Sequence, residues 1–219
     1  MSDRGERTRR RILDEAEQLY GARGVDGVSL REIRIAAGQR NTSALQFHFG
    51  GADGLLRALA QRHMPAIGSL QQRLRAQLVP VDGPAPPEVL TEVMVRPWAD
   101  YITRGPGPRA WVRIAAELSA RPERQMVEFQ DHAPAVMVEL GAELLAHLVA
   151  AVGPDVGLDR LMRVNLACLH VCADRARVED SALSSELHIL AHDDWVTDLV
   201  DTAIASMLAP SRLRITSMT

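Results

Sequence analysis

The residues best suited to chemistry in this 219-residue chain are short polar side chains gathered between positions 40 and 48. Such donor and acceptor groups bond to base edges and phosphate oxygens when they project from the start of a helix. Gln46 can pair with the edge of adenine or guanine. His48 can reach a phosphate or pack against the first helix, and Phe47 can touch the sugar-phosphate wall or the next helix. Against the alternative of an ordinary solvated helix face, we predict DNA contacts from Arg40, Asn41, Thr42, Ser43, Gln46, Phe47 and His48.

Two short helices joined by a glycine turn are expected to position these side chains. Ser29 followed by Glu32 has the spacing of a capping box, so a helix should begin there. Gly38 comes directly after its apolar face, where a helix end favours left-handed backbone. In the second segment, Leu45 and Phe49 are four residues apart and bury one side. The pattern predicts a helix-turn-helix.

Arginines cluster where the first expected helix begins. The helix dipole disfavours positive charge at this end, and a phosphate would compensate for it. We therefore predict a phosphate contact from Arg9, with a solubilising tail as the alternative for the cluster. Ser29 can meet a second phosphate through the backbone N–H groups of its helix start, in competition with its capping role. The cluster comprises Arg4, Arg7, Arg9, Arg10 and Arg11.

Several motifs between residues 8 and 60 agree in order and spacing with those of a known family. They are Arg9-Arg10-Arg11-Ile12-Leu13-Asp14, Leu19-Tyr20, Gly24, Ser29-Leu30-Arg31-Glu32-Ile33, Ala36-Ala37-Gly38, Phe47-His48-Phe49 and Leu55-Leu56. Here the chain resembles the DNA-binding half of TetR-type transcriptional regulators. The resemblance implies a three-helix DNA-binding bundle followed by a larger helical domain that binds a ligand and dimerises.

Two positions depart from the family pattern. Between Gly38 and Leu45 the chain carries one residue more than usual, so the start of the recognition helix is expected to be extended or shifted. The basic residue that the family commonly places after its aromatic motif is missing, and Gly50-Gly51-Ala52-Asp53 stands there instead. A phosphate contact at that point is not expected.

The composition favours an all-α fold of about nine helices. Aromatic residues make up 4% of the chain, and apolar residues recur at helical spacing. Residues 1–64 hold 11 arginines against 8 acidic residues, whereas residues 65–219 hold 14 against 20. A basic first part beside an acidic remainder indicates a nucleic-acid module attached to another unit. We predict a DNA-binding domain over 1–64 and an effector-binding and dimerisation domain over 65–219.

Aromatic and methionine side chains on the central helices suggest a small-molecule pocket, although such a stripe also forms ordinary core. Pro97 lies inside an expected helix, where it kinks the backbone and opens space. Arg113 can supply a polar group there or form a surface salt bridge with Glu117. The candidate pocket residues are Trp98, Tyr101, Trp111, Arg113, Met126, Phe129 and Met137.

The last two expected helices, 158–177 and 193–208, each carry a wide apolar stripe. Two such helices from each of two subunits can form a four-helix interface with two-fold symmetry. The alternative is that the stripes cover the ligand domain of the same chain. The predicted homodimer interface comprises Leu161, Asn165, Cys168, Leu169, Cys172, Val196, Val200, Ala203, Ile204 and Met207.

Signals for catalysis, cofactors and metals are weak. The sequence has no glycine-rich phosphate loop, no G-x-S-x-G elbow and no His-Glu-x-x-His motif. His188 and His192 have helix-compatible metal spacing, but they precede Asp193 in what looks like a loop before a helix start. Cys168 and Cys172 resemble small buried hydrophobes. We expect no enzyme, no cofactor and no bound metal.

Taken as a whole, the sequence predicts a ligand-responsive DNA-binding regulator. We expect a homodimeric repressor that a small, mainly apolar effector releases from double-stranded operator DNA. The alternative is a helical small-molecule-binding protein or enzyme whose basic N-terminus is structural. No signal peptide and no apolar run of twenty residues is found, so we expect a cytoplasmic protein without a membrane span.

Overall fold

The computed structural model describes residues 3–41, 43–79, 83–121, 132–181 and 190–210. Within these ranges the chain forms nine α-helices and no strand, which confirms the predicted all-α class. The N-terminal bundle contains α1 (Asp3–Arg23), α2 (Leu30–Ala36) and α3 (Ala44–Phe49). The helices that follow are α4 (Ala52–Leu78), α5 (Pro87–Ile102), α6 (Pro106–Ser119), α8 (Ala135–Val152), α9 (Pro154–Glu179) and α10 (His192–Leu208).

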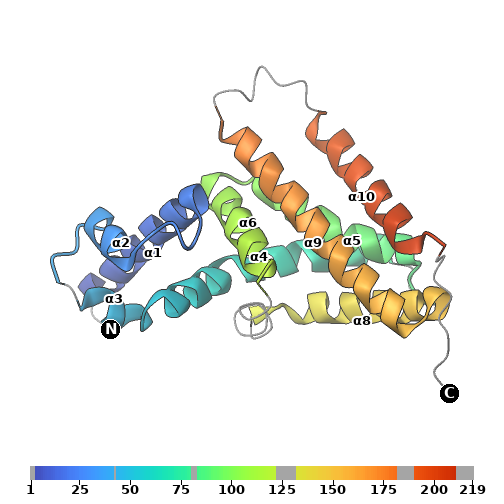
Figure 1. Ribbon diagram of the computed structural model, residues 1–219, viewed down its shortest axis with the longest axis horizontal. Coiled ribbons are helices and arrows are strands. Elements are labelled where there is room, and N and C mark those ends of the chain that lie inside the picture. Colours follow the sequence, from blue (N-terminus) through green and yellow to red (C-terminus); the bar gives the residue numbers. More distant parts are fainter. Residues whose placement is uncertain (1–2, 42, 80–82, 122–131, 182–189, 211–219) are drawn as a thin grey trace.

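Helix α4 joins the two halves of the molecule. It begins beside α3 and ends among the C-terminal helices, where it packs against α5 and α8 (Figure 1). Pro65 does not end this helix, because α4 continues through it to Leu78. The carbonyl of Pro65 accepts a hydrogen bond from Ser69 Oγ at 2.8 Å. One helix therefore spans the boundary that we predicted near residue 64.

The N-terminal bundle is packed directly onto the C-terminal helices through α1 and α6. A Cβ added to Gly21 of α1 would lie 2.5 Å from Cβ of Ala110, so only glycine allows this approach. Nearby, the backbone N–H of Val25 donates to Glu117 Oε2 at 2.8 Å. The buried apolar residues form one cluster that continues from α1 to α10. The two predicted domains thus share a single core.

A buried polar cluster lies where α1, α4, α5 and α6 meet. His63 Nε2 is 3.1 Å from Glu17 Oε2, and His63 Nδ1 is 2.8 Å from the Tyr101 hydroxyl. A carboxylate can only accept, so His63 Nε2 carries a proton, while Nδ1 and the Tyr101 hydroxyl share the second hydrogen bond. The imidazole stacks on the Trp111 ring at 5.4 Å. Each polar partner belongs to a different helix, so the cluster fixes how these helices are oriented.

Ionisation of Glu17 is coupled to this packing. Burial alone would raise the pKa of Glu17, but hydrogen bonds and charge from His63 and Arg62 outweigh burial and leave the pKa lowered. Arg62 donates to Glu17 Oε2 at 2.7 Å. Because the folded state prefers the carboxylate, Glu17 stabilises the fold above its ordinary pKa and loses this contribution as the pH falls through the lowered value.

We predict that Glu17→Gln makes folding less sensitive to acid. The free energy of unfolding of the parent should fall more steeply than that of Glu17→Gln as the pH drops below the ordinary carboxyl value of 4.5. Urea unfolding at neutral and at successively lower pH measures both curves. Glu15→Gln, on the same helix outside the cluster, is the matched control and should follow the parent. Parallel curves for the parent and Glu17→Gln would contradict the assignment.

Candidate nucleic-acid interface and ligand pocket

Helix α2 begins as the sequence predicted. Ser29 is its N-cap, with its hydroxyl accepting from the Glu32 backbone N–H at 3.2 Å, while Glu32 Oε2 accepts from the Ser29 backbone N–H at 2.8 Å. The bonds from Ser29, with the charge of Arg23, lower the pKa of Glu32 to about 2. Gly38 follows the helix with a φ of 65°, which is left-handed. These local contacts set the position at which the turn toward α3 begins.

The start of α3 lies later than its N-cap residue types suggest. The helix begins at Ala44, and the turn before it is closed by Asn41, whose Oδ1 accepts from the backbone N–H of Ser43 at 2.9 Å. Ser43 occupies the N-cap position without a side-chain capping bond. Helix α3 is six residues long. Thr42 lies outside the described residues.

Burial divides α3 into two faces, as its sequence spacing predicted. Ala44, Leu45 and Phe49 are buried, and Gln46 is exposed. Phe47 is 79% exposed, which leaves it without cover from the next helix. His48 is half-buried, with its ring 5.1 Å from the Phe47 ring in an edge-on arrangement. The exposed face thus offers an amide, an aromatic ring and part of an imidazole.

Contacts with α1 and α4 hold α3 in place. The Arg9 guanidinium lies over the Phe49 ring, 5.2 Å from its centre. Gly54 of α4 faces the carbonyl of Phe49, and a Cβ at this position would collide with it. Close approach of α4 therefore requires glycine here. The arrangement brings Arg9 next to α3 although forty residues separate them in sequence.

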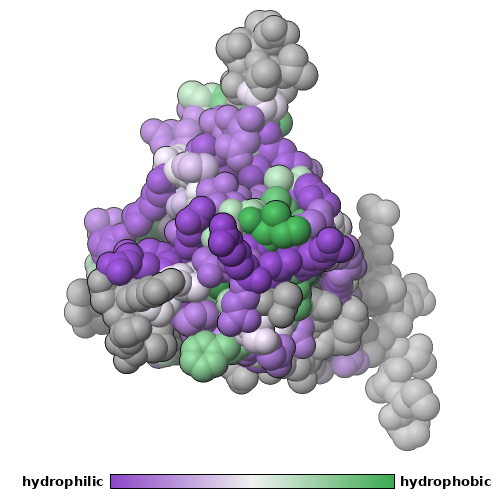
Figure 2. Space-filling view, turned by 90° about the vertical axis from the view of Figure 1, so that its left-hand side faces the viewer, coloured by the Kyte–Doolittle hydropathy of each residue, from purple (hydrophilic) through white to green (hydrophobic). Residues whose placement is uncertain are grey.

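The end of the molecule formed by α1–α3 is strongly hydrophilic. Figure 2 looks onto this end and shows mostly polar surface with isolated apolar patches. Four predicted contacts, Ser29, Arg40, Asn41 and Ser43, are exposed there. Asp53 opens α4 where the family pattern commonly has a basic residue, and it is exposed too. Such a surface suits a polyanion at the α3 face, with an acidic residue at one edge.

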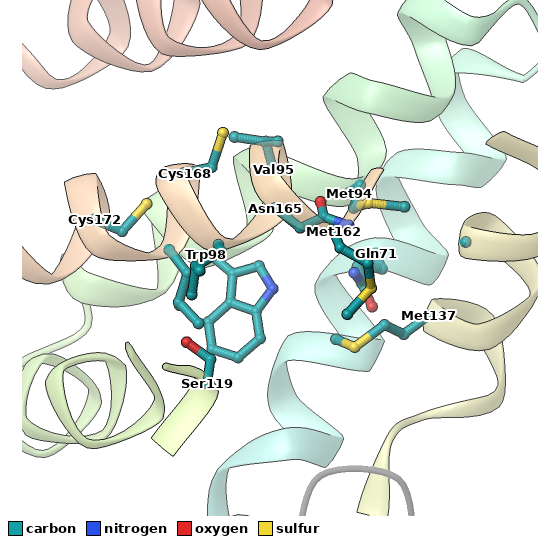
Figure 3. A pocket seen from close by; sticks show the side chains of 13 residues that line it. Gln71, Met94, Val95, Trp98, Ser119, Met137, Met162, Asn165, Cys168 and Cys172 are labelled. Carbon is teal, nitrogen blue, oxygen red and sulfur yellow. The ribbon is translucent and has the colours of Figure 1, made fainter. Parts of the chain in front are cut away.

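A cavity of about 240 Å³ lies between α4, α5, α8 and α9. Two predicted pocket residues, Trp98 and Met137, line it (Figure 3). The other lining residues are Gln71, Met94, Val95, Ser119, Gly141, Met162, Asn165, Leu166, Cys168, Leu169 and Cys172. The lining is mainly apolar with a few polar groups, which is typical of small-molecule sites.

Three of the predicted pocket residues lie elsewhere. Tyr101 and Trp111 are buried in the polar cluster around His63 and do not line this cavity. Arg113 pairs with Asp180, the C-cap of α9, at 2.7 Å, in place of the expected partner Glu117. Helical spacing placed these side chains inward, but it did not indicate which inward region they would reach. Met126 and Phe129 lie outside the described residues.

Gln71 was not predicted, yet it is the most unusual residue of the cavity. Its side chain is completely buried, and neither its amide nitrogen nor its amide oxygen has a hydrogen-bond partner among the residues that the structure describes. An unsatisfied buried polar group costs about 1–3 kcal/mol. The sequence held one signal for it, because Gln71 interrupts the apolar positions Met64, Ile67 and Leu74 on the inner side of α4.

The predicted dimer stripe needs correction. Seven of its members are buried within the single chain: Leu161, Cys168, Cys172, Val196, Val200, Ala203 and Met207. Asn165 and Leu169 are half-buried and line the cavity, and Ile204 packs partly buried against the core. These stripes cover their own domain, because α9 packs on α6 and α8 while α10 packs on α5. A partner would have to use the outward faces.

Two further sequence signals concern metals and membranes. Within the described ranges no group of three metal-ligating side chains gathers, and His192 Nε2 lies 3.1 Å from Asp100 Oδ1. His188 falls outside those ranges. Helix α8 alone among the described helices has the length and hydropathy of a membrane span, with a mean hydropathy of 1.8. Within the described residues 22% of this helix is buried, including Leu140, Leu144 and Leu148, while Val138 and Val149 are exposed.

Comparison with known proteins agrees on the fold. No protein-family model matches the sequence, and no curated protein does. A tetR-family regulatory protein from Rhodococcus RHA1 matches 96% of this chain and 100% of its own, with 15% identity and a TM-score of 0.51. A putative TetR-family transcriptional regulator from Mesorhizobium loti MAFF303099 matches 95% and 98%, with 13% identity and a TM-score of 0.52.

A third similar structure is the TetR-family regulator PfmR from Thermus thermophilus. It covers 88% of this chain and 96% of its own, with 18% identity and a TM-score of 0.50. All three matches extend over both halves of the molecule. The chain therefore has the fold of TetR-type regulators, as the sequence motifs predicted.

We predict opposite effects of alanine at two helical glycines near the cavity. A Cβ at Gly141, on the cavity wall, meets no atom within 4 Å, so Gly141→Ala should stabilise the fold by about 0.5–1 kcal/mol through helix propensity. At Gly68 a Cβ would lie 2.6 Å from Cβ of Pro134, so Gly68→Ala should destabilise by about 1–3 kcal/mol. Urea unfolding of both variants tests this, and equal effects would show that the cavity wall is wrongly placed.

Proposed function

We propose that this chain is a ligand-responsive transcriptional regulator that binds double-stranded operator DNA as a homodimer in the cytoplasm, most simply as a repressor. The observation that carries the proposal is the exposed face of α3, which is held rigidly by Phe49 and Gly54 against α1 and α4. A short helix with its polar face outward at the tip of a helix-turn-helix suits the major groove. The shared fold supports the same conclusion.

The exposed side chains divide into base-reading and phosphate-binding groups. Gln46 reads a base edge, and Asn41 keeps its amide N–H groups free for a second one, because only its oxygen is used in the turn. Arg40, His48 and the helix start at Ser29 bind phosphates. Arg9 stacks on Phe49 and directs its charge to the backbone beside α3. Phe47 packs on the sugar-phosphate wall.

Helix α4 offers a physical connection between DNA and effector. Its first turns pack against α3, His63 lies at its middle in the buried cluster, and Gln71 reaches the cavity. An effector that fits only one arrangement of α4 shifts the population toward that arrangement. The two recognition helices of a dimer then no longer match major grooves about 34–36 Å apart, and the operator is released.

The homodimer is proposed to form through the outward faces of α9 and α10. A groove of about 490 Å³ separates these helices, and Ala167 and Val171 line it beside Thr202. Val171, which lines the groove, is a large apolar residue exposed on α9. A partner's helices placed in this groove would cover it, and a stable interface should bury more than about 1,000 Å².

We predict distinct effects for two kinds of DNA-contact variant. Gln46→Ala and Asn41→Ala should each weaken specific binding by about 1–3 kcal/mol and relax one operator position. Arg9→Ala should weaken binding to all sequences alike and reduce the salt slope by about one. Gel shifts on the DNA upstream of the gene measure each, with Gln77→Ala, exposed at the far end of α4, as control. A protein without salt-dependent DNA binding would instead be a helical small-molecule-binding protein or enzyme.

We predict that charge in the α9–α10 groove separates the subunits. The double variant Ala167→Asp with Val171→Asp should be monomeric by light scattering, remain helical by circular dichroism, and bind operator at least about tenfold more weakly. Ala150→Asp, on the exposed side of α8, is the control and should remain dimeric. A parent protein that scatters as a monomer at micromolar concentration would refute the two-fold arrangement.

A further inference from the structure

We propose that the cavity beside α4 takes an uncharged, flat, mainly apolar molecule that carries a hydrogen-bond donor and acceptor side by side, as in a carboxamide or lactam, and that Gln71 recognises this group. This inference depends on the proposed regulatory function at one point, which is that the ligand acts as an effector. Its physical basis is the buried amide of Gln71, which lacks a partner for both its nitrogen and its oxygen.

The geometry of the glutamine amide specifies the complementary group. Its N–H donates and its C=O accepts within one plane, so a ligand satisfies both only with an adjacent acceptor and donor. In Figure 3 the Gln71 side chain lies among the cavity-lining residues, with the Trp98 indole on the other side of the same space. An aromatic wall favours a flat ring on the ligand. Recognition thus combines a polar end at α4 and an apolar body against α5.

The described lining of the cavity disfavours an ionic ligand. In the part of the chain that the structure describes, the polar lining residues are Gln71, Ser119 and Asn165, all neutral. Arg75, one turn from Gln71 on α4, pairs with Glu143 at 2.5 Å and does not line the cavity. Burial raises the pKa of the Cys168 thiol to about 11, so this residue is neutral as well. A carboxylate or ammonium would be buried here without a counter-ion, which is costly.

Access to Gln71 requires movement of methionines. The amide is completely buried, and Met94, Met137 and Met162 lie around it in Figure 3. Met162 is 51% exposed, so its side chain can move toward solvent. Methionine is unbranched and adapts to irregular shapes, so these residues can repack around a ligand. Water is the alternative hydrogen-bond partner of the Gln71 amide.

Three probes with the same ring system test the ligand class: 2-naphthamide, 2-naphthoate and 2-methylnaphthalene. Calorimetry measures their binding to the full-length parent, to Gln71→Leu and to Gln77→Leu, an exposed glutamine of the same helix. We expect the parent and Gln77→Leu to bind the amide at least about tenfold tighter than the other two. The hydrocarbon leaves both atoms of the Gln71 amide unpaired, and the naphthoate leaves the amide oxygen unpaired and buries a charge. Gln71→Leu should lose this preference, keep its affinity for the hydrocarbon, and melt at a higher temperature without ligand.

The possible results separate the inference from the proposed function. Three results would overturn the inference and leave water as the partner of Gln71. The parent and Gln71→Leu could bind all three probes equally, the parent could prefer the naphthoate, or no probe could bind. Retained hydrocarbon binding by Gln71→Leu shows that the cavity is intact, so the lost preference is not misfolding. A gel shift with the bound amide tests the function separately. If the amide binds through Gln71 but no DNA is bound or released, the regulator proposal fails and the ligand class stands.

Discussion

The hydrogen-bonded chain from Glu17 through His63 to Tyr101 is the contact on which both functional regions depend. Its three members come from α1, α4 and α5, and each is buried. A buried polar atom without a partner is costly, so the three helices keep the orientation in which all of these bonds are made. The ring of Trp111 on α6 stacks against His63 and closes the same junction. The α3 face and the cavity are therefore held in a defined relation.

Helix α4 contains two buried polar side chains in contrasting states. His63 is bonded at both ring nitrogens, whereas Gln71, about two turns later, is bonded at neither amide atom. A satisfied group holds a structure together, and an unsatisfied one gains free energy when a ligand or water reaches it. Helix α4 thus has one buried polar side chain, His63, that holds neighbouring helices in place near the DNA-binding bundle. It has a second, Gln71, that can gain hydrogen bonds from a ligand in the cavity.

The recognition segment from α2 to α3 shows which features can be predicted from residues that are close in sequence. The capping box at Ser29, the left-handed Gly38 and the burial of Leu45 and Phe49 were all predictable, because each involves residues within a few positions of one another. The first residue of α3 was harder to predict from the sequence. The Asn41 side chain closes a turn instead of capping the helix directly, and several N-cap residue types in a row do not distinguish these arrangements. Helix α4 likewise continues through Pro65, although proline lacks the backbone N–H.

The sequence by itself determined the all-α class, the helix-turn-helix and its polar face, because helical periodicity and capping depend on neighbouring residues. Only the tertiary structure decided what the apolar stripes cover. Val196 and Met207 on α10, and Cys172 on α9, pack into their own domain, although the same pattern suits a partner's helix equally well. Tyr101 and Trp111 likewise face inward, but toward His63, while Gln71 faces the cavity. Helical periodicity predicts that an apolar or inward-facing side chain is buried. Contacts between segments that are distant in sequence decide which residues surround it.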